Sequence, residues 1–501
     1  MFYRTLTTCI FFFFYLFTAQ CLYAQVKQDT SVKKLISEIE KFKKEPALKN
    51  AKWGICVITA DSGKTVVAYN DSSGLIPAST MKAINTAAAI SILGKDFTFK
   101  TFLEYDGDID KQGVLHGNLY IRGGGDPTLG SPRIDTMNDM KYLLPRWITH
   151  IRKQGIKKID GSVVGDASIF DDTIAPSSWV YGDLGNYYGA GASGLTFHEN
   201  AFRIIFKPGK KYKDSARIVE VDPPIPYITL KNKVRTGGIY TAEDTWVFGG
   251  PYENTRTIKG IIPRNNKEFL IRTSLPDPAF FCAYSLFKAL SDSGIVVTDS
   301  ATTFKTLKEQ GKTKNKTITV FYTQESPPLD TIAYYTNQKS INTYAEDIIK
   351  ILAYEKTGTG STYNGTQVVT AFWKSKGVNL QGFIMKDGSG LSPKNCVSPR
   401  QLAEIMRAYL TDTMFTVFYH TLPIAGRSGT ISKIFKGTIA ENNLRAKSGY
   451  MRGLRAYTGY VYNKNNKMLI FGIIVNNHSA TADKMRSLLE KIMVLIAETE
   501  W

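Results

Sequence analysis

The chain is poor in the residues that build metal sites and disulfide frameworks. Its 501 residues include only five cysteines and five histidines. No Cys-x-x-Cys pair occurs, and the histidines never cluster at metal-ligand spacing, so we expect no metal site and no cofactor. Beyond residue 24 three cysteines remain, an odd number that excludes a disulfide-built scaffold. We expect Cys56, Cys282 and Cys396 to be free thiols, buried in the fold.

Long apolar runs are also missing from the sequence. The most apolar stretch, TCIFFFFYLF (8–17), is too short to span a bilayer; Arg4 precedes it and a small residue, Ala24, follows. This pattern is typical of a secretory signal peptide, so residues 1–24 are expected to be removed and the protein to be exported, to the periplasm. A lipoprotein signal that retains Cys21 is a poorer fit. No later segment has the roughly 18 to 20 apolar residues of a transmembrane helix.

Acidic residues are too few to balance the basic ones. The sequence has 63 lysines and arginines against 44 aspartates and glutamates, a net charge of +19. Such a balance can favour nucleic acid, an anionic membrane or an acidic polymer. Export argues against nucleic acid, and the lysines are dispersed apart from a loop-like run at 305–316. We expect a mainly solvated basic surface, with a polyanionic extracellular polymer as the remaining alternative.

The two ends of the chain have the pattern of one sheet-and-helix domain. Strand-like runs occur at 53–70 and again at 444–477. Residues 98–276 are instead rich in glycine, proline and short strands. We therefore predict that 25–97 and 277–501 are two parts of one domain, split by a β-rich insertion.

One serine and one lysine stand three residues apart in the segment PASTMKAINTAAA (77–89). Ser-x-x-Lys occurs three times in the chain, but only Ser79 lies at the start of a predicted helix. The spacing places Ser79 and Lys82 on one helix face, and a helix N-terminus can stabilise an oxyanion. Taken alone, the motif fits a capping serine beside a solvated lysine even better.

A second motif, Ser340-Ile341-Asn342, is the only Ser-x-Asn in the sequence. Both polar residues also favour helix caps. As chemistry, Ser340 could relay protons between the Lys82 amine and a leaving nitrogen, and the Asn342 amide could bind a substrate carbonyl.

The third motif has two candidates. Lys356-Thr357-Gly358 ends the helix that begins near Ser340, where a lysine and a capping glycine are ordinary. Lys447-Ser448-Gly449 lies on an apolar-rich strand near the C-terminus and could face a cleft beside Ser79. We choose 447–449.

Serine, Ser-x-Asn and Lys-Ser-Gly in this order resemble the penicillin-binding proteins. The sequence is most similar to the D-alanyl-D-alanine carboxypeptidase/endopeptidase family of low-molecular-mass class C, peptidase family S13. The resemblance covers nearly the whole mature chain, and the family carries a large insertion between its first two motifs. Further similar stretches are GGGDPTL (123–129), GDASIFDD (165–172), YGAGASGLTFHEN (188–200), SPPLDTI (326–332), DGSGLS (387–392) and LPIAGRSGT (422–430).

The resemblance implies an α+β (α/β/α) fold of the serine β-lactamase and penicillin-binding-protein type. An antiparallel sheet is flanked by helices, and a large domain is inserted. The parts at 25–97 and 277–501 are then catalytic, and the inserted part spans 98–276.

The resemblance also implies the role of each motif residue. Ser79 attacks the penultimate D-alanine carbonyl and forms an acyl-enzyme, with Lys82 as its base. Lys82 is expected to have a lowered pKa in a buried, cation-rich site. Lys447 holds the terminal carboxylate and lowers the pKa of Lys82 by repulsion. The backbone N–H groups of Ser79 and Tyr450 form the oxyanion hole.

Several positions are expected to line the substrate site, some of them with departures from the family pattern. Ser448 stands where threonine is commoner and keeps the hydroxyl; Gly449 follows it, and Leu391 lies in DGSGLS. Pro393 follows that stretch where the family often has an arginine, which leaves the stem-peptide selectivity open.

Trp179 and Asp183 have a Trp-x-x-x-Asp spacing that resembles the family's pocket for the amino end of a diaminopimelate-type stem. A core tryptophan and a loop aspartate are an equal alternative.

The sequence therefore predicts a hydrolase that acts on peptidoglycan peptides. It releases terminal D-alanine or cuts D-Ala–diaminopimelate cross-links, and penicillins acylate it. The alternatives are a β-lactamase or esterase on the same fold, or a silent muropeptide-binding protein. The sequence does not indicate an oligomeric state.

Overall fold

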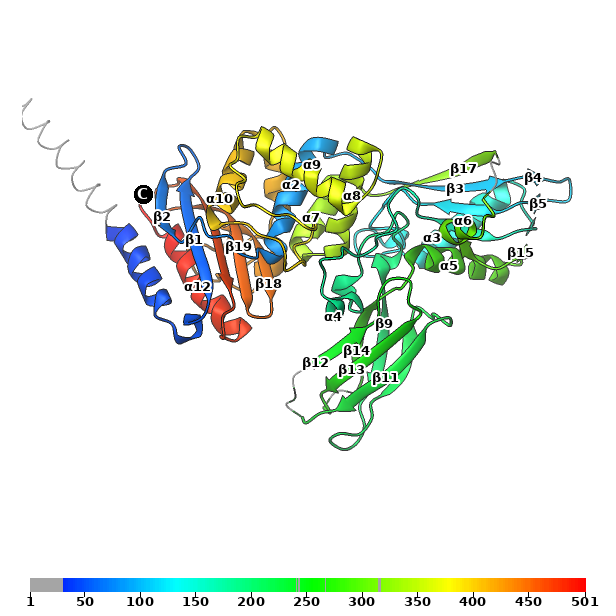
Figure 1. The fold of residues 1–501 in the computed structure, drawn as a ribbon, viewed down its shortest axis with the longest axis horizontal. Coiled ribbons are helices and arrows are strands. Elements are labelled where there is room, and N and C mark those ends of the chain that lie inside the picture. Colours follow the sequence, from blue (N-terminus) through cyan, green and yellow to red (C-terminus); the bar gives the residue numbers. More distant parts are fainter. Residues whose placement is uncertain (1–29, 240, 242–243, 266, 314–316) are drawn as a thin grey trace, which may run out of the picture.

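The computed structural model describes residues 30–501 except 240, 242–243, 266 and 314–316. The predicted signal peptide, residues 1–24, lies outside the described residues. The two ends of the chain build a sandwich of a sheet between two helical layers, and the middle of the chain builds an inserted region (Figure 1).

Five antiparallel strands form the central sheet of the sandwich. Alternate residues of a strand face opposite sides of a sheet. Ile55 and Val57 accordingly pack into one apolar cluster, and Cys56 and Ile58 pack into another on the opposite face. In spatial order the strands are β18 (Arg445–Met451), β19 (Leu454–Tyr462), β20 (Met468–Asn476), β1 (Lys52–Thr59) and β2 (Thr65–Tyr69).

Helices cover both faces of this sheet. One face packs against a helix that includes residues 30–43 and against α12 (Ala482–Ala497). The other face packs around α2, in which every residue from Met81 to Ile90 is buried. The helices of this second layer are α2 (Met81–Leu93), α7 (Leu329–Lys339), α8 (Asn342–Thr357), α9 (Thr362–Ser375), α10 (Pro399–Ala408) and α11 (Phe415–Thr421). This layer lies between the sheet and the inserted region (Figure 1).

The inserted region has its own apolar core, which includes residues of four sheets and of α3 (Met140–Lys153) and α5 (Pro278–Asp292). Two mixed sheets contain β3 (Lys100–Asp106), β4 (Asp108–Ile109), β5 (Val114–His116), β6 (Leu119–Arg122), β7 (Lys158–Ile159), β8 (Val163–Asp166), β15 (Val296–Val297), β16 (Thr302–Thr303) and β17 (Ile318–Glu325). Two three-stranded sheets contain β9 (Ala201–Lys207), β10 (Arg217–Asp222), β11 (Thr229–Thr236), β12 (Asp244–Phe248), β13 (Thr255–Ile262) and β14 (Phe269–Ser274). The short helices are α4 (Tyr181–Leu184) and α6 (Phe304–Glu309).

The inserted region ends later than the sequence predicted. The expected boundary at 276 is wrong, because α5 contributes Phe281, Leu286 and Leu290 to the core of the inserted region. Strand β17 then pairs antiparallel with β3, so the inserted region continues to Glu325. An apolar helix pattern shows that a face is buried but not which core it contacts.

The three cysteines beyond residue 24 are free thiols; Cys56 and Cys282 are buried, and Cys396 is half-buried. No helix among the described residues is long and apolar enough to cross a membrane.

Candidate active site

Ser79 lies in a tight turn that leads into the central helix. The turn is a 3-10 helix, η2 (Ala78–Thr80), and α2 follows it directly. Ala78 has a φ of 47°, a left-handed conformation that is uncommon and strained for a residue with a side chain. The Thr80 hydroxyl donates to the Pro77 carbonyl at 2.8 Å and closes the turn.

Two glycines allow other segments to pack against this turn. A Cβ atom on Gly390 would lie 1.9 Å from the Ala78 carbonyl oxygen, and one on Gly449 would lie 2.6 Å from the Pro77 oxygen. No side chain fits at either distance. The Ser79 turn is therefore held between the 387–392 loop and strand β18.

Lys82 is fully buried and contacts three acceptors. Its Nζ donates to Ser79 Oγ at 2.9 Å, to Asn342 Oδ1 at 2.6 Å and to the Ser389 carbonyl at 2.7 Å. Burial lowers the pKa of Lys82 to about 7. A substantial fraction of neutral amine at neutral pH can therefore accept a proton from the Ser79 hydroxyl.

The cause of this low pKa agrees with one part of the sequence expectation and differs from the other. Lys82 was expected to lie in a buried, cation-rich site with repulsion from Lys447. Burial does lower its pKa, but the charges that act on it are those of Asp387 and Glu346, which raise it. The repulsion is felt at Lys447, whose pKa lies well below its usual value because of burial and the charge of Lys82.

Ser340 and Lys447 form a second hydroxyl–amine pair. Lys447 is fully buried on β18, and its Nζ donates to Ser340 Oγ at 2.8 Å and to the Ser448 carbonyl at 2.8 Å. Ser340 ends α7 with a φ of 57°, in the left-handed region. It is thus not the N-terminal cap of α8, a position that Ile341 occupies. The strained turn between α7 and α8 directs the Ser340 hydroxyl to Lys447.

Asn342 begins α8, and protein groups use both ends of its amide. Its Oδ1 accepts from Lys82, and its Nδ2 donates to the Tyr188 carbonyl at 2.7 Å. The Nδ2 group carries two N–H donors, so one remains for a substrate carbonyl beside the Tyr188 oxygen. In this arrangement Asn342 orients Lys82 and links the sandwich to the inserted region.

The other residues expected on β18 lie beside the Ser79 turn. Ser448 Oγ donates to Thr430 Oγ1 at 2.7 Å. A Cβ on Gly449 would lie 3.2 Å from the Ser79 nitrogen, so the β18 backbone runs alongside that amide. Tyr450, the next residue, is 53% exposed. The two N–H groups predicted for an oxyanion hole therefore come from adjacent segments.

The residues expected to line a stem-peptide pocket have other partners. Trp179 is buried, and its indole N–H donates to Asp387 Oδ2 at 2.8 Å, which favours the core alternative for this tryptophan. Asp183 accepts a hydrogen bond from the Tyr188 hydroxyl at 3.3 Å, and burial raises its pKa. Leu391 is 9% exposed within the 387–392 loop.

Asp387 is a central residue that sequence reasoning missed. Besides Trp179, it accepts from the backbone N–H groups of Gly390 at 2.8 Å and Ser392 at 2.6 Å, and from Asn395 Nδ2 at 2.8 Å. Four donors fix the 387–392 loop around this buried carboxylate. The Asp-Gly pair within DGSGLS is a turn signal that could have identified it.

Glu346 is the second residue that was missed. It is buried on α8 and accepts from the N–H groups of Gly388 at 3.2 Å and Ser389 at 2.7 Å. Burial and the charge of Asp387 raise the pKa of Glu346 to about 7. These bonds position the Ser389 carbonyl against Lys82. The signal in the sequence is a glutamate four residues after Asn342, on the same helix face.

The rejected motifs have structural roles. Gly358 caps the C-terminus of α8 with a φ of 72°, as expected, and Lys356 is exposed in the last turn. In α5, the Ser285 hydroxyl donates to the Phe281 carbonyl, and Lys288 pairs with an aspartate of its own helix. The described residues contain no group of three or more histidine, cysteine or acidic side chains that could hold a metal ion.

Comparisons with known proteins identify the fold and the family. The chain is 26% identical over 460 residues to a D-alanyl-D-alanine carboxypeptidase of Actinomadura sp. (strain R39), covering 89% of this chain and 82% of that protein. It is 25% identical over 433 residues to the D-alanyl-D-alanine carboxypeptidase DacB of Haemophilus influenzae, covering 85% of each.

Solved structures agree with these relatives. The crystal structure of penicillin binding protein 4 (dacB) from Haemophilus influenzae matches with a TM-score of 0.77 at 23% identity, covering 93% of this chain and 98% of that one. The same protein complexed with a β-lactam matches with a TM-score of 0.73. The predicted α+β fold of the penicillin-binding-protein type is confirmed. The model of the D-Ala-D-Ala carboxypeptidase 3 (S13) family matches residues 35–498, and the chain belongs to this family.

Proposed function

We propose that this protein is a serine-type D-alanyl-D-alanine peptidase that cleaves peptidoglycan stem peptides through an acyl-enzyme on Ser79. The observation that carries the proposal is the contact of 2.9 Å between Ser79 Oγ and Nζ of Lys82, a buried lysine whose pKa is lowered to about 7. A serine hydroxyl is a weak nucleophile without such a base. Family membership and the relatives' named activity support the same reaction.

Acylation begins when neutral Lys82 takes the Ser79 proton and Ser79 Oγ attacks the carbonyl of the penultimate D-alanine. The N–H groups of Ser79 and Tyr450 stabilise the developing oxyanion. The tetrahedral intermediate collapses as the peptide C–N bond breaks. The proton held by Lys82 reaches the leaving nitrogen, with the Ser340 hydroxyl as the relay, and the C-terminal fragment departs as a free amine.

Lys447 holds the terminal carboxylate of the substrate. Burial and the charge of Lys82 hold the pKa of Lys447 well below its usual value. An arriving carboxylate stabilises the ammonium form and so acts in the opposite direction. Ser448, Gly449 and Leu391 line the same site.

Water completes the cycle by attacking the acyl-enzyme ester, with Lys82 again accepting a proton. β-Lactams acylate the same serine, in keeping with the β-lactam complex of the Haemophilus influenzae relative. Asp183 remains our candidate for the amino end of a diaminopimelate-type stem, because a partly buried carboxylate suits an ammonium group. We also infer export to the periplasm from the signal-like pattern at 1–24.

Labelled penicillin tests the assignment. It is expected to attach covalently to Ser79 in the purified protein, and labelling that persists in Ser79→Ala would refute it. Mass spectrometry of purified muropeptides after incubation then separates the two activities. Loss of one D-alanine from monomers indicates a carboxypeptidase, and conversion of dimers to monomers indicates an endopeptidase.

A further inference from the structure

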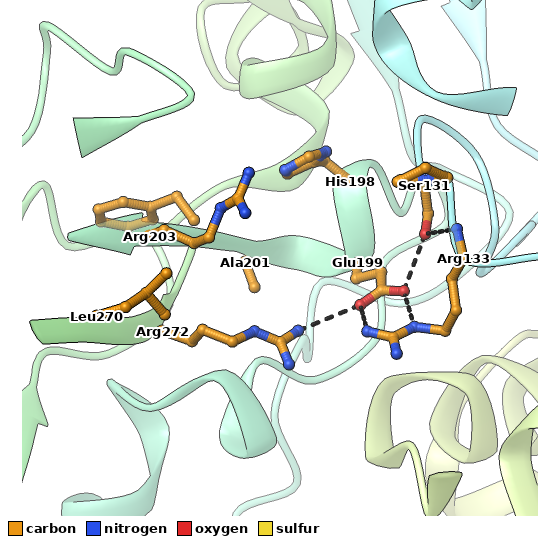
Figure 2. Close-up of a pocket in the computed structure, with 10 residues that line it drawn as sticks. Ser131, Arg133, His198, Glu199, Ala201, Arg203, Leu270 and Arg272 are labelled. Carbon is orange, nitrogen blue, oxygen red and sulfur yellow. Dashed lines mark hydrogen bonds and ion pairs between the residues drawn. The ribbon is translucent and has the colours of Figure 1, made fainter. Parts of the chain in front are cut away.

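A second cavity, of about 450 Å³, lies in the inserted region beside strands β9 and β14. Figure 2 shows its side chains, with Arg133 and Arg272 bonded to a single carboxylate, Glu199, and Arg203 apart from them. Aliphatic and aromatic side chains, including Leu270, complete the lining. Cavities of about 300 to 1,000 Å³ with a few converging polar groups are typical of small-ligand sites.

Glu199 is already saturated with donors. Its carboxylate accepts from the Arg133 guanidinium, from the Ser131 hydroxyl at 2.9 Å and from the Tyr344 hydroxyl at 3.4 Å. Although burial acts to raise its pKa, Arg133 holds the pKa of Glu199 below its usual value. Glu199 is therefore anionic at neutral pH and neutralises Arg133.

Of the other two arginines, only Arg272 leaves the cavity with an excess of positive charge. Arg203 has its own partner, Asp222. Arg272 contacts Glu199 Oε2 at 3.3 Å, and the same oxygen also accepts a hydrogen bond from Arg133. Its guanidinium lies 4.3 Å from the centre of the Tyr187 ring, and its side chain is 35% exposed. Arg272 is thus held in place while part of its planar set of N–H donors remains accessible.

Two short chains of contacts join the cavity to the catalytic site. Tyr187, on which Arg272 stacks, precedes Tyr188, whose carbonyl accepts from Asn342. Tyr344, which donates to Glu199, lies two residues after Asn342 on α8. Asn342 in turn contacts Lys82. The start of α8 and the Tyr187–Tyr188 pair therefore contact both sites, which places the cavity within a few residues of extended peptide from Lys82.

The backbone of the cavity wall is strained at one place. His198, Glu199 and Asn200 all have left-handed conformations, with φ values of 53°, 57° and 52°. Such residues persist only where the surrounding structure fixes them. The position of Glu199, and of the arginines bound to it, is accordingly well defined.

We propose that this cavity binds a carboxylate of the peptidoglycan stem peptide other than its C-terminal one, with the Arg272 guanidinium as the main contact. The proposal rests on the proposed function and extends it to a second anion subsite, separate from Lys447. A guanidinium recognises a carboxylate through two parallel hydrogen bonds, and the apolar lining suits the aliphatic part of such a side chain.

Two stem pentapeptides ending in D-Ala-D-Ala test this subsite, one with free side-chain carboxylates and one with these converted to carboxamides. For the unaltered enzyme we expect kcat/KM to be roughly tenfold higher for the free acid, mainly through KM, as for a hydrogen bond to a charged group. In Arg272→Gln this preference is expected to fall to about one. Arg272→Lys, which keeps the charge without the planar fork, is expected to retain part of it.

The matched control is Arg217→Gln, which removes an exposed arginine of the neighbouring strand β10 outside the cavity. It should keep the full preference. Binding of both peptides to the Ser79→Ala variant, with and without Arg272→Gln, repeats the comparison without turnover.

Equal kcat/KM values for the two peptides with the unaltered protein would overturn the proposed subsite. So does a loss in Arg272→Gln that is equal for both peptides, because that pattern belongs to a structural tie between Arg272 and Glu199. Failure of the proposed function looks different: penicillin does not label Ser79 and neither peptide is cleaved. The binding comparison then still decides the subsite.

Discussion

Three lysines of the described chain are fully buried, and they fall into two kinds. Lys350, on α8, forms an ion pair with Asp171 at 2.7 Å and donates to the Thr173 carbonyl, which ties the sandwich to the inserted region. Lys82 and Lys447 instead contact hydroxyl, amide and carbonyl oxygens, and neither has a carboxylate within ion-pair distance.

The difference in partners separates a structural lysine from a reactive one. An adjacent carboxylate stabilises the ammonium form and compensates for burial. Without it, desolvation lowers the pKa of Lys82 to about 7, and the neutral amine can act as a base. Burial alone therefore does not distinguish these lysines; the paired carboxylate does, and we propose that its absence marks the reactive ones.

The largest effect is expected at Lys82. In Lys82→Met the rate of penicillin acylation should fall by roughly 10²- to 10⁴-fold, the usual contribution of a general base. The melting temperature should change little, because the desolvation cost of the buried amine is removed together with the three hydrogen bonds that it donates. Stopped-flow acylation and thermal unfolding measure the two quantities. Acylation at the original rate would mean that another group is the base.

The second-largest effect on activity is expected at Lys447. Lys447→Ala removes the proposed partner of the substrate carboxylate, so kcat/KM on a D-Ala-D-Ala peptide should fall by roughly 10- to 100-fold, or about 1.5–3 kcal/mol. Lys356→Ala, in the rejected Lys-Thr-Gly, is the control and should remain near the original rate. A larger loss in Lys356→Ala than in Lys447→Ala would reverse our choice of the third motif.

Substitution of Lys350 should instead lower stability and leave acylation unchanged. Lys350→Met leaves Asp171 unpaired at 34% exposure, so we expect the free energy of unfolding to fall by about 1–3 kcal/mol, less than for a fully buried pair. Acylation per folded molecule should be unchanged. Denaturant titration and active-site labelling measure the two quantities. A loss of acylation without a loss of stability would contradict the structural assignment.

The smallest expected effect is a shift in the pH dependence of acylation. Because Lys82 must be neutral to act, the acylation rate should rise with pH and level off above its pKa of about 7. Glu346→Gln removes a negative charge that raises this pKa, so the midpoint should move to lower pH, by less than about one unit. A pH–rate profile of both proteins measures this shift. A midpoint that moves upward would exclude the proposed electrostatics.

The candidate site was accessible from the sequence because its motifs combine in a fixed order. Ser79 was chosen from three Ser-x-x-Lys pairs by the single Ser-x-Asn and a strand-borne Lys-Ser-Gly, and the structure places these residues in contact. Asp387 and Glu346 were missed because most of their partners are backbone N–H groups of the 387–392 loop, whose path only the fold reveals. The boundary at 276 was wrong for a similar reason, because the apolar face of α5 does not indicate which core it packs against.

The sequence by itself predicted the strand-like runs at 53–70 and 444–477, the helix that starts at Ser79 and the motif residues of the candidate site. The tertiary structure alone decided which lysines are buried and what they contact. Lys82 and Asn342 are 260 residues apart in the chain, and their contact depends on the packing of α2 against α8. A pKa depends on desolvation and on charges nearby in space. The segment PASTMK therefore identifies the serine and the lysine, but only the fold lowers the pKa of that lysine.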